Sequence, residues 1–137
     1  MKVREIMTTN VECIAPDTSV ESIAQKMHTL NVGFLAVCDH DRLVGTVTDR
    51  DIVIRGIAVG RDMKSAKTRD VMTHDVHWSY ETDDVEDVAE AMSDKQVRRM
   101  LILNDEKRLV GVVSLGDISK VEEKESGKTL RDISEAA

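Results

Sequence analysis

The chain has 137 residues, of which 41% are hydrophobic and 33% are charged, a balance typical of a folded globular protein. Its 26 acidic residues outnumber the 19 lysines and arginines, and the resulting net charge of −7 disfavours nucleic acid and anionic membrane surfaces as partners. The sequence has no apolar run of membrane-spanning length and no signal-like N-terminus. We therefore expect a cytoplasmic protein with no nucleic-acid partner and no membrane partner.

A short strand is predicted at Val11–Ile14, and an amphipathic helix follows the single proline of the chain. The apolar residues of that helix recur at i, i+3, i+4 and i+7, so they form one buried stripe. They are Val20, Ile23, Ala24 and Met27. Thr18 and Glu21 have the spacing of a capping box at the start of this helix. Two strands joined by a polar turn come next, over residues 34–38 and 43–48.

The segment Ile52–Val59 is predicted to form a second helix, and it is apolar on nearly every face. Leaving such a helix in water costs about 25 cal/mol for each Å² of apolar surface exposed. Its counterpart in the second half of the chain, residues 118–122, is half polar. We expect either the other half or a second chain to cover it, and we favour a homodimer contact made through this helix.

The second half of the chain repeats the first. Residues 3–8 read Val-Arg-Glu-Ile-Met-Thr and residues 68–73 read Thr-Arg-Asp-Val-Met-Thr, and we call these two segments the lead-ins. An offset of 65 relates the two copies, and it becomes 66 after an inserted turn residue. The second copy predicts a strand, a helix, two strands and a helix, at Val76–Ser79, Val85–Asp94, Met100–Leu103, Leu109–Ser114 and Ile118–Glu123. Asp83 and Glu86 repeat the capping-box spacing.

Strand, helix and strand make a parallel pair by a right-handed crossover, and the third strand adds antiparallel. We therefore predict an α/β (α+β) fold of tandem β-α-β-β-α repeats with pseudo-two-fold symmetry, each with a small mixed sheet packed on helices. The predicted boundaries are 1–60 for repeat 1, 61–67 for a linker, 68–123 for repeat 2 and 124–137 for a charged tail. Within the tail, residues 129–133 are either a third lead-in copy or part of a solvated end. Neither repeat alone buries much surface, so we expect the two to pack together.

Cys13 and Cys38 are the only cysteines, and both fall in predicted strands that the crossover helix sets side by side. One interpretation is two small buried apolar residues, and the other is a redox-sensitive pair. Repeat 2 has Trp78 and Leu103 at the matching positions, so a disulfide would belong to repeat 1 alone. The cysteine and histidine spacing of a metal site is absent from the sequence, so we predict no metal ligands.

In both repeats a hydroxyl residue at the end of a strand is followed, three positions on, by an aspartate. These pairs are Thr48 with Asp51 and Ser114 with Asp117. The spacing is that of a capping box, and an aspartate in the first turn of a helix suits the helix dipole. A short carboxylate at a strand–helix junction also suits a vicinal diol such as that of ribose, and a helix N-terminus favours phosphate. The pattern alone leaves both interpretations open.

Arg98 and Arg99 lie just before a predicted strand of repeat 2. The planar guanidinium group matches phosphate oxygens, so these arginines and the diol acceptors together indicate a nucleotide monophosphate or a related ligand. A pair of solvated surface arginines is the alternative. Arg50, inside the first hydroxyl–aspartate motif, is a further candidate ligand-binding residue.

The element order, the Ile-Met-Thr lead-in and the motifs Gly-x-x-Thr-x-x-Asp and Gly-x-x-Ser-x-x-Asp resemble a pair of CBS domains, also called a Bateman module. The resemblance runs from Val3 to about Lys120 and indicates a stand-alone CBS pair with no attached enzyme. It implies regulatory binding of an adenosine-containing ligand in clefts between the repeats, such as AMP, ADP, ATP, NAD(H) or S-adenosylmethionine. It also implies a separate regulated protein, which the sequence does not identify.

The family's ligand contacts comprise ribose acceptors, hydroxyl contacts, a basic phosphate contact and backbone facing the adenine. By position, the resemblance implies that Asp51 and Asp117 are the ribose acceptors and that Thr48 and Ser114 are the hydroxyl contacts. It likewise implies that Arg98 is the phosphate contact and that the backbone at Val11 and Val76 faces the adenine. Repeat 1 departs from the pattern, because Gly33 and Phe34 stand where repeat 2 has its two arginines. We therefore expect two unequal clefts.

The sequence has no nucleophile–base pair, no Gly-rich phosphate loop and no cluster of metal ligands. We therefore predict no enzymatic activity and no required cofactor, with an adenine nucleotide as the expected bound ligand. Two alternatives remain. One is a ligand-free structural dimer that acts through protein contacts, and the other is a redox- or metal-responsive protein that uses Cys13 and Cys38.

Overall fold

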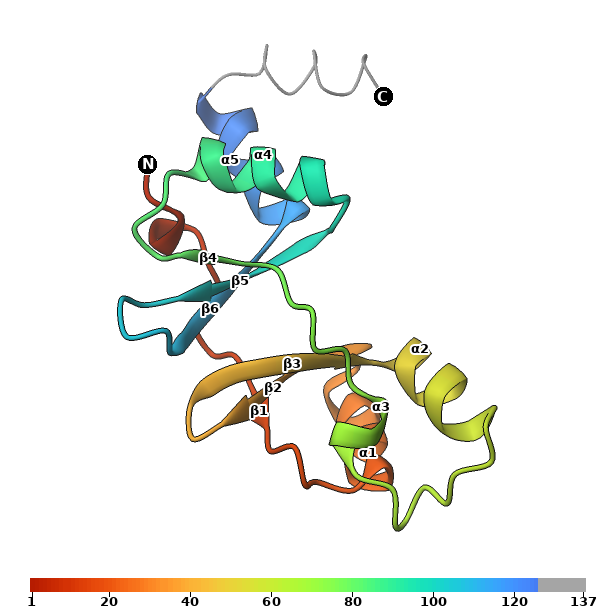
Figure 1. Ribbon diagram of the computed structural model, residues 1–137. Coiled ribbons are helices and arrows are strands. Elements are labelled where there is room, and N and C mark those ends of the chain that lie inside the picture. The colour runs from red at the N-terminus through yellow and green to blue at the C-terminus, as the bar shows by residue number, and fades with distance from the viewer. Residues whose placement is uncertain (126–137) are drawn as a thin grey trace. The chain divides into compact units, whose positions relative to one another are not determined.

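A computed structural model describes residues 1–125 of the chain (Figure 1). They form two compact units, each built on a three-stranded sheet, which confirms the predicted mixed α+β fold of tandem repeats. We call residues 12–76 the first-sheet unit, and residues 1–11 together with residues 77–125 the second-sheet unit. From residue 126 onward the predicted tail, including its lead-in-like segment, lies outside the described residues.

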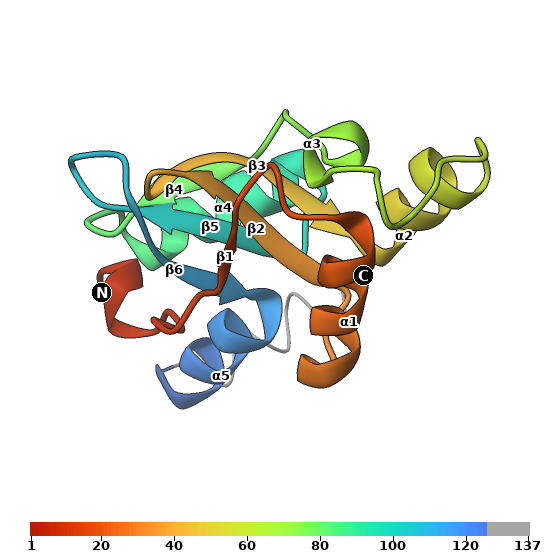
Figure 2. The same ribbon diagram turned by 90° about the horizontal axis from the view of Figure 1, so that it is seen from below.

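The first-sheet unit has the strand order β1-β2-β3 (Figures 1 and 2). β1 (Cys13–Ile14) pairs in parallel with β2 (Phe34–Asp39), and β2 pairs antiparallel with β3 (Arg42–Thr48). The crossover helix α1 (Val20–Leu30) connects β1 to β2. This is the predicted connection, but β1 begins two residues later than predicted, because its pairing with β2 covers two residues.

Three of the four apolar residues predicted to form the buried stripe of α1 are buried, whereas Ala24 is exposed. Val20 and Ile23 are 0% exposed, and Met27 is 6% exposed. Ser19, however, caps this helix, with its Oγ accepting a hydrogen bond from the Ser22 amide at 3.2 Å. The predicted capping box at Thr18 is wrong by one residue. The reason is that the Thr18 carbonyl accepts two hydrogen bonds from Thr68, each of 2.8 Å, as the chain returns to pack on this unit.

After β3 the chain continues through α2 (Asp49–Asp51) into η2 (Ile52–Ile57), which has π-helical geometry, and later forms α3 (Thr68–Val71). The predicted α-helix at Ile52–Val59 is therefore wrong in its start and its type. A hydrogen bond from the Ala58 amide to the Val53 carbonyl, of 2.8 Å, closes the wider turn. Ile52 and Gly56 face the core of the unit, whereas the other apolar side chains of this segment are exposed.

The second-sheet unit repeats the topology with the order β4-β5-β6 (Figure 2). Its strands and helices are β4 (Trp78–Tyr80), α4 (Val85–Lys95), β5 (Arg99–Leu103), β6 (Leu109–Ser114) and α5 (Leu115–Glu125). Asp84, and not Asp83, is the N-cap residue of α4. The Asp83 carboxylate instead accepts a hydrogen bond from the Tyr80 amide at 2.9 Å, which shapes the turn before the helix. Within residues 1–125 no helix is long and apolar enough to cross a membrane.

Each lead-in packs on the sheet of the other repeat. The first lead-in contains η1 (Val3–Glu5), and its Thr8 exchanges two backbone hydrogen bonds with Val112 of β6, of 2.9 and 3.0 Å (Figures 1 and 2). The second lead-in does the same to β3, where Thr73 and Thr46 exchange bonds of 2.8 and 2.9 Å. The compact units therefore divide the chain differently from the sequence copies, and the boundaries predicted for those copies stay a prediction.

Candidate functional site

The hydroxyl–aspartate pair of the second-sheet unit lies where β6 passes into α5. The Asp117 amide donates to Ser114 Oγ at 3.1 Å, and the Ser114 amide donates to Asp117 Oδ2 at 2.9 Å. This capping box explains why α5 begins at Leu115, three residues before the predicted start. Both side chains are half-buried. An ionised carboxylate offers about four acceptor positions, so the cap leaves most of the acceptor capacity of Asp117 available.

The two arginines reach the same end of the second sheet. Arg99 pairs with Ser114 across β5 and β6, and the Leu115 amide donates to the Arg98 carbonyl at 3.1 Å. Both arginines are exposed at this sheet end. The backbones of both arginines therefore lie at the edge that carries a hydroxyl, a carboxylate and a helix N-terminus, and residues of these types suit a ribose phosphate.

The first-sheet unit has the same capping box, formed by Thr48 and Asp51 with distances of 3.0 and 3.1 Å. Here a further group intervenes. The hydroxyl of Thr73, in the second lead-in, lies 3.3 Å from both carboxylate oxygens of Asp51. Thr73 was not among the predicted site residues, although its place next to the repeated methionine in the lead-in was the available signal. The Asp51 carboxylate therefore has one hydrogen-bond partner, the Thr73 hydroxyl, beyond the capping box that it shares in kind with Asp117.

The first-sheet site also differs in its charge. Phe34 pairs with Thr48 where the second sheet has Arg99, and Gly33 accepts a hydrogen bond from the Asp49 amide where the second sheet has Arg98. A Cβ atom added at Gly33 would lie 2.8 Å from an oxygen of the Asp49 carboxylate, so a bulky side chain does not fit there without a shift. Arg50 is exposed in α2, at the position that Gly116 holds in α5. The two sites therefore differ in their side chains, and their unequal binding of a ligand stays a prediction.

The predicted adenine contacts lie at the inner ends of the lead-ins. Val11 and Val76 are both half-buried. Because the lead-ins are exchanged, Val11 belongs to the unit with Asp117, and Val76 belongs to the unit with Asp51. The assignment of these residues to ligand binding stays a prediction.

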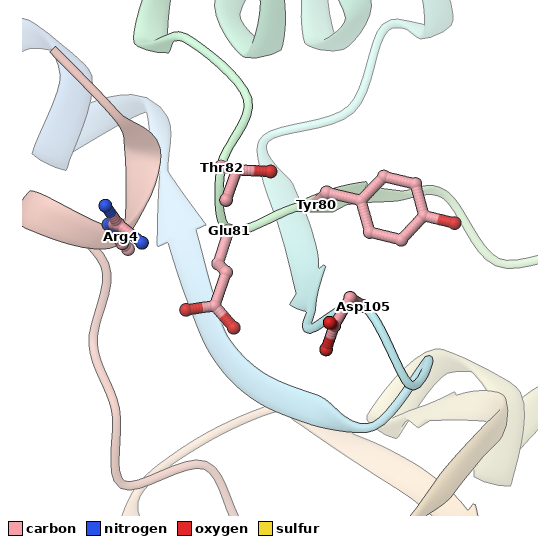
Figure 3. Close-up of a pocket in the computed structure, with 5 residues that line it drawn as sticks. All are labelled: Arg4, Tyr80, Glu81, Thr82 and Asp105. Carbon is pink, nitrogen blue, oxygen red and sulfur yellow. The ribbon is translucent and has the colours of Figure 1, made fainter.

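Two cavities of the second-sheet unit were not predicted. One, of about 490 Å³, is lined by Arg4, Tyr80, Glu81, Thr82 and Asp105 (Figure 3). These residues come from η1, from the last residue of β4 and the turn after it, and from the turn after β5, at the opposite end of the sheet from Ser114. The other, of about 450 Å³, is a mainly apolar groove between α4 and α5 that Arg98 and Leu115 help to line. No sequence motif marks either cavity, because their linings come from separate segments.

Within residues 1–125 no group of three or more His, Cys, Asp or Glu side chains is placed to hold a metal ion. The two cysteines nevertheless lie close together, on the paired strands β1 and β2.

The family model for the CBS domain matches this chain twice, over residues 3–56 and 69–124. The chain belongs to the CBS-domain family. The two matches coincide with the two sequence copies, and each contains one hydroxyl–aspartate motif at the end of a sheet. The predicted family is therefore confirmed.

Relatives of the same length class match most of this CBS pair. Hypoxic response protein 1 of Mycobacterium tuberculosis is 35% identical over 85% of this chain and 82% of its own length. The uncharacterized protein YlbB of Bacillus subtilis is 38% identical over 98% of this chain and 92% of its own. The similarity therefore extends over most of the length of both relatives.

Two solved structures extend the comparison. A crystal structure of hypoxic response protein 1 with two coordinated zinc ions has a TM-score of 0.79 and 33% identity, covering 88% of this chain and 98% of that one. The CBS domain pair of protein MJ0100, in complex with methylthioadenosine and S-adenosyl-L-methionine, has a TM-score of 0.73 and 26% identity. It covers 92% of this chain and 98% of that one. Structures of this family therefore include one with adenosine-containing ligands.

Proposed function

We propose that this CBS pair is a regulatory module that binds an adenosine-containing ligand and signals its occupancy to a separate protein. The observation that supports the proposal is that the backbones of Arg98 and Arg99 lie beside Ser114 and Asp117, where β6 passes into α5. Guanidinium groups suit phosphate, and a short carboxylate suits the ribose diol. The MJ0100 complex supports the choice of adenosine compounds as the ligand class.

The second-sheet unit is the better candidate for a charged phosphate. Its edge carries two arginines, and position 115 is a leucine. The first-sheet edge has Asp49 at the matching position, and Gly33 and Phe34 in place of the arginines. A phosphate placed there would meet an added negative charge and fewer cations, which disfavours it. We propose that the second-sheet site binds the nucleotide more tightly, with Val11 beside the adenine, and that any binding at Thr48, Arg50, Asp51 and Val76 is weaker.

The proposal is tested by measuring the melting temperature of the protein with AMP, ADP, ATP, NAD(H) and S-adenosylmethionine in turn. A ligand whose free concentration is 100 times its Kd stabilises the folded state by about 2.7 kcal/mol. We therefore expect at least one compound to raise the melting temperature by several degrees. Inosine and free phosphate serve as controls. If no member of the panel changes the melting temperature, the ligand-free structural dimer becomes the better description.

We also propose that the protein is a homodimer that associates through η2. Val53, Ile54 and Ile57 of η2 and Val59 just after it are each 48–64% exposed, so this part of the chain presents a concentrated apolar surface to water. A second copy of the same segment offers a matching apolar face, as a two-fold contact requires.

Replacing Ile57 by lysine tests the homodimer, because a charge in an apolar contact must be desolvated. We expect sedimentation velocity to show a dimer for the parent protein and a monomer for Ile57→Lys. Leu30→Lys, at an exposed apolar position of α1, is the matched control and should remain dimeric. A parent protein that sediments as a monomer, or an Ile57→Lys variant that stays dimeric, contradicts association through η2.

A further inference from the structure

The parallel pairing of β1 with β2 brings the only two thiols of the chain together. Cys13 lies opposite Ala36, and Cys38 is two residues further along β2, so the two side chains share one face of the sheet. The two thiols are close enough for each to shift the pKa of the other. They are not equivalent, since Cys13 is exposed and Cys38 is 6% exposed.

The proximity of the two thiols shifts their pKa values in opposite directions. The hydrogen bond from Cys38 lowers the pKa of Cys13, and this outweighs the opposing effects of burial and of the Asp41 carboxylate. The same hydrogen bond, together with burial and the nearby negative charges, raises the pKa of Cys38. Cys13 is therefore the sulfur with the greater thiolate fraction and the greater access to solvent, and these two properties control cysteine reactivity.

We propose that Cys13 and Cys38 form a peroxide-reactive dithiol site, with Cys13 as the attacking sulfur and Cys38 as the resolving sulfur. The Cys13 thiolate attacks one oxygen of hydrogen peroxide, forming an S–O bond and breaking the O–O bond, and the departing hydroxide is protonated to water. The Cys38 sulfur then attacks Cys13, forming the S–S bond and releasing a second water, which takes up the Cys38 proton. Two thiols are oxidised to one disulfide while one peroxide is reduced to two waters.

The bond would join β1 to β2 within the first-sheet unit. β1 has two paired residues, so a covalent link to the longer β2 would fix an otherwise short edge strand. The second-sheet unit has Trp78 and Leu103 at the matching positions and therefore lacks this chemistry. The site is independent of the proposed nucleotide binding, because it uses neither the arginines nor the hydroxyl–aspartate motifs.

The test treats the intact protein with hydrogen peroxide and then counts free thiols after denaturation. We expect both thiols to disappear and the chain to lose the mass of two hydrogen atoms without doubling. Peptide mapping of the parent protein should find Cys13 linked to Cys38, a readout that needs no variant. Retention of both thiols under conditions that fully oxidise free cysteine, or a disulfide between two chains, overturns the proposal.

Single variants assign the two roles. In Cys38→Ser we expect Cys13 to form a sulfenic acid that dimedone traps. In Cys13→Ser we expect Cys38 to keep its thiol, because it is buried away from the peroxide. Equal rates of thiol loss in the two variants, with circular dichroism spectra like that of the parent, would show that neither sulfur is the preferred nucleophile and would contradict the assignment.

Discussion

Replacing Gly45 by alanine is expected to destabilise the protein by about 2 kcal/mol, in the range for overpacking a tightly packed site. A Cβ atom at this position would lie 2.6 Å from the carbonyl oxygen of Thr73 and 3.3 Å from the Met72 sulfur. The carbonyl cannot move away cheaply, because Thr73 and Thr46 exchange two backbone hydrogen bonds beside it. The added methyl group therefore pushes the second lead-in away from β3.

Urea denaturation followed by circular dichroism measures this effect. Gly116→Ala is the matched control, because its Cβ would lie 3.5 Å from Ser114 Oγ, an ordinary contact, and its position is helical. Alanine in a helix is favoured over glycine by roughly 0.5–1 kcal/mol, so the control should be as stable as the parent or more stable. An unchanged urea midpoint for Gly45→Ala would mean that the lead-in does not approach β3 this closely.

Replacing Asp117 by asparagine is expected to weaken nucleotide binding by roughly 10- to 100-fold, since a hydrogen bond to a charged group contributes about 1.5–3 kcal/mol. The amide oxygen of asparagine can still accept the hydrogen bond from the Ser114 amide, so the cap of α5 is preserved. What is lost is the charge and the second acceptor oxygen, which we assign to the ribose diol. Affinity should therefore fall while stability without ligand changes little.

Isothermal titration calorimetry with the panel compound that raises the melting temperature most is the measurement. Asp51→Asn is the matched control, because both Asp51 oxygens already face the Thr73 hydroxyl and its unit lacks the paired arginines. We expect Asp51→Asn to alter the affinity less than Asp117→Asn does. Equal affinity of the parent protein and Asp117→Asn would remove Asp117 from the ligand site while leaving the binding function itself intact.

The carboxylates of Asp51 and Asp117 differ in their hydrogen-bond partners. Thr73 lies in the second lead-in, so the state of Asp51 depends on how that lead-in sits on β3. Arg55 strengthens the same arrangement, because its Nη1 donates to the Met72 carbonyl at 2.9 Å. The position of Asp51 is therefore tied to the second lead-in, whereas Asp117 has no such contact among the hydrogen bonds of the described residues.

Local patterns were read correctly from the sequence where the physical cause is local. Val20, Ile23 and Met27 are buried as predicted, because a stripe of apolar residues at helical spacing has one favourable orientation toward a core. The strand pairing within each repeat was predicted, since a crossover helix of this length leaves few alternatives. The capping boxes at Ser114 and Thr48 were recognised because both partners lie within one turn.

The sequence by itself therefore determined the duplication, the family, the order of elements and the two hydroxyl–aspartate motifs, all of which depend on neighbours along the chain. Tertiary structure alone decided the exchange of the lead-ins and the contact between Thr73 and Asp51, residues that lie far apart in sequence. For Cys13 and Cys38 the sequence predicted neighbouring strands, and the register of β1 against β2 then decided how close the two side chains lie. Such contacts are fixed by the packing of whole elements, and a local pattern of residues does not record which distant partner that packing selects.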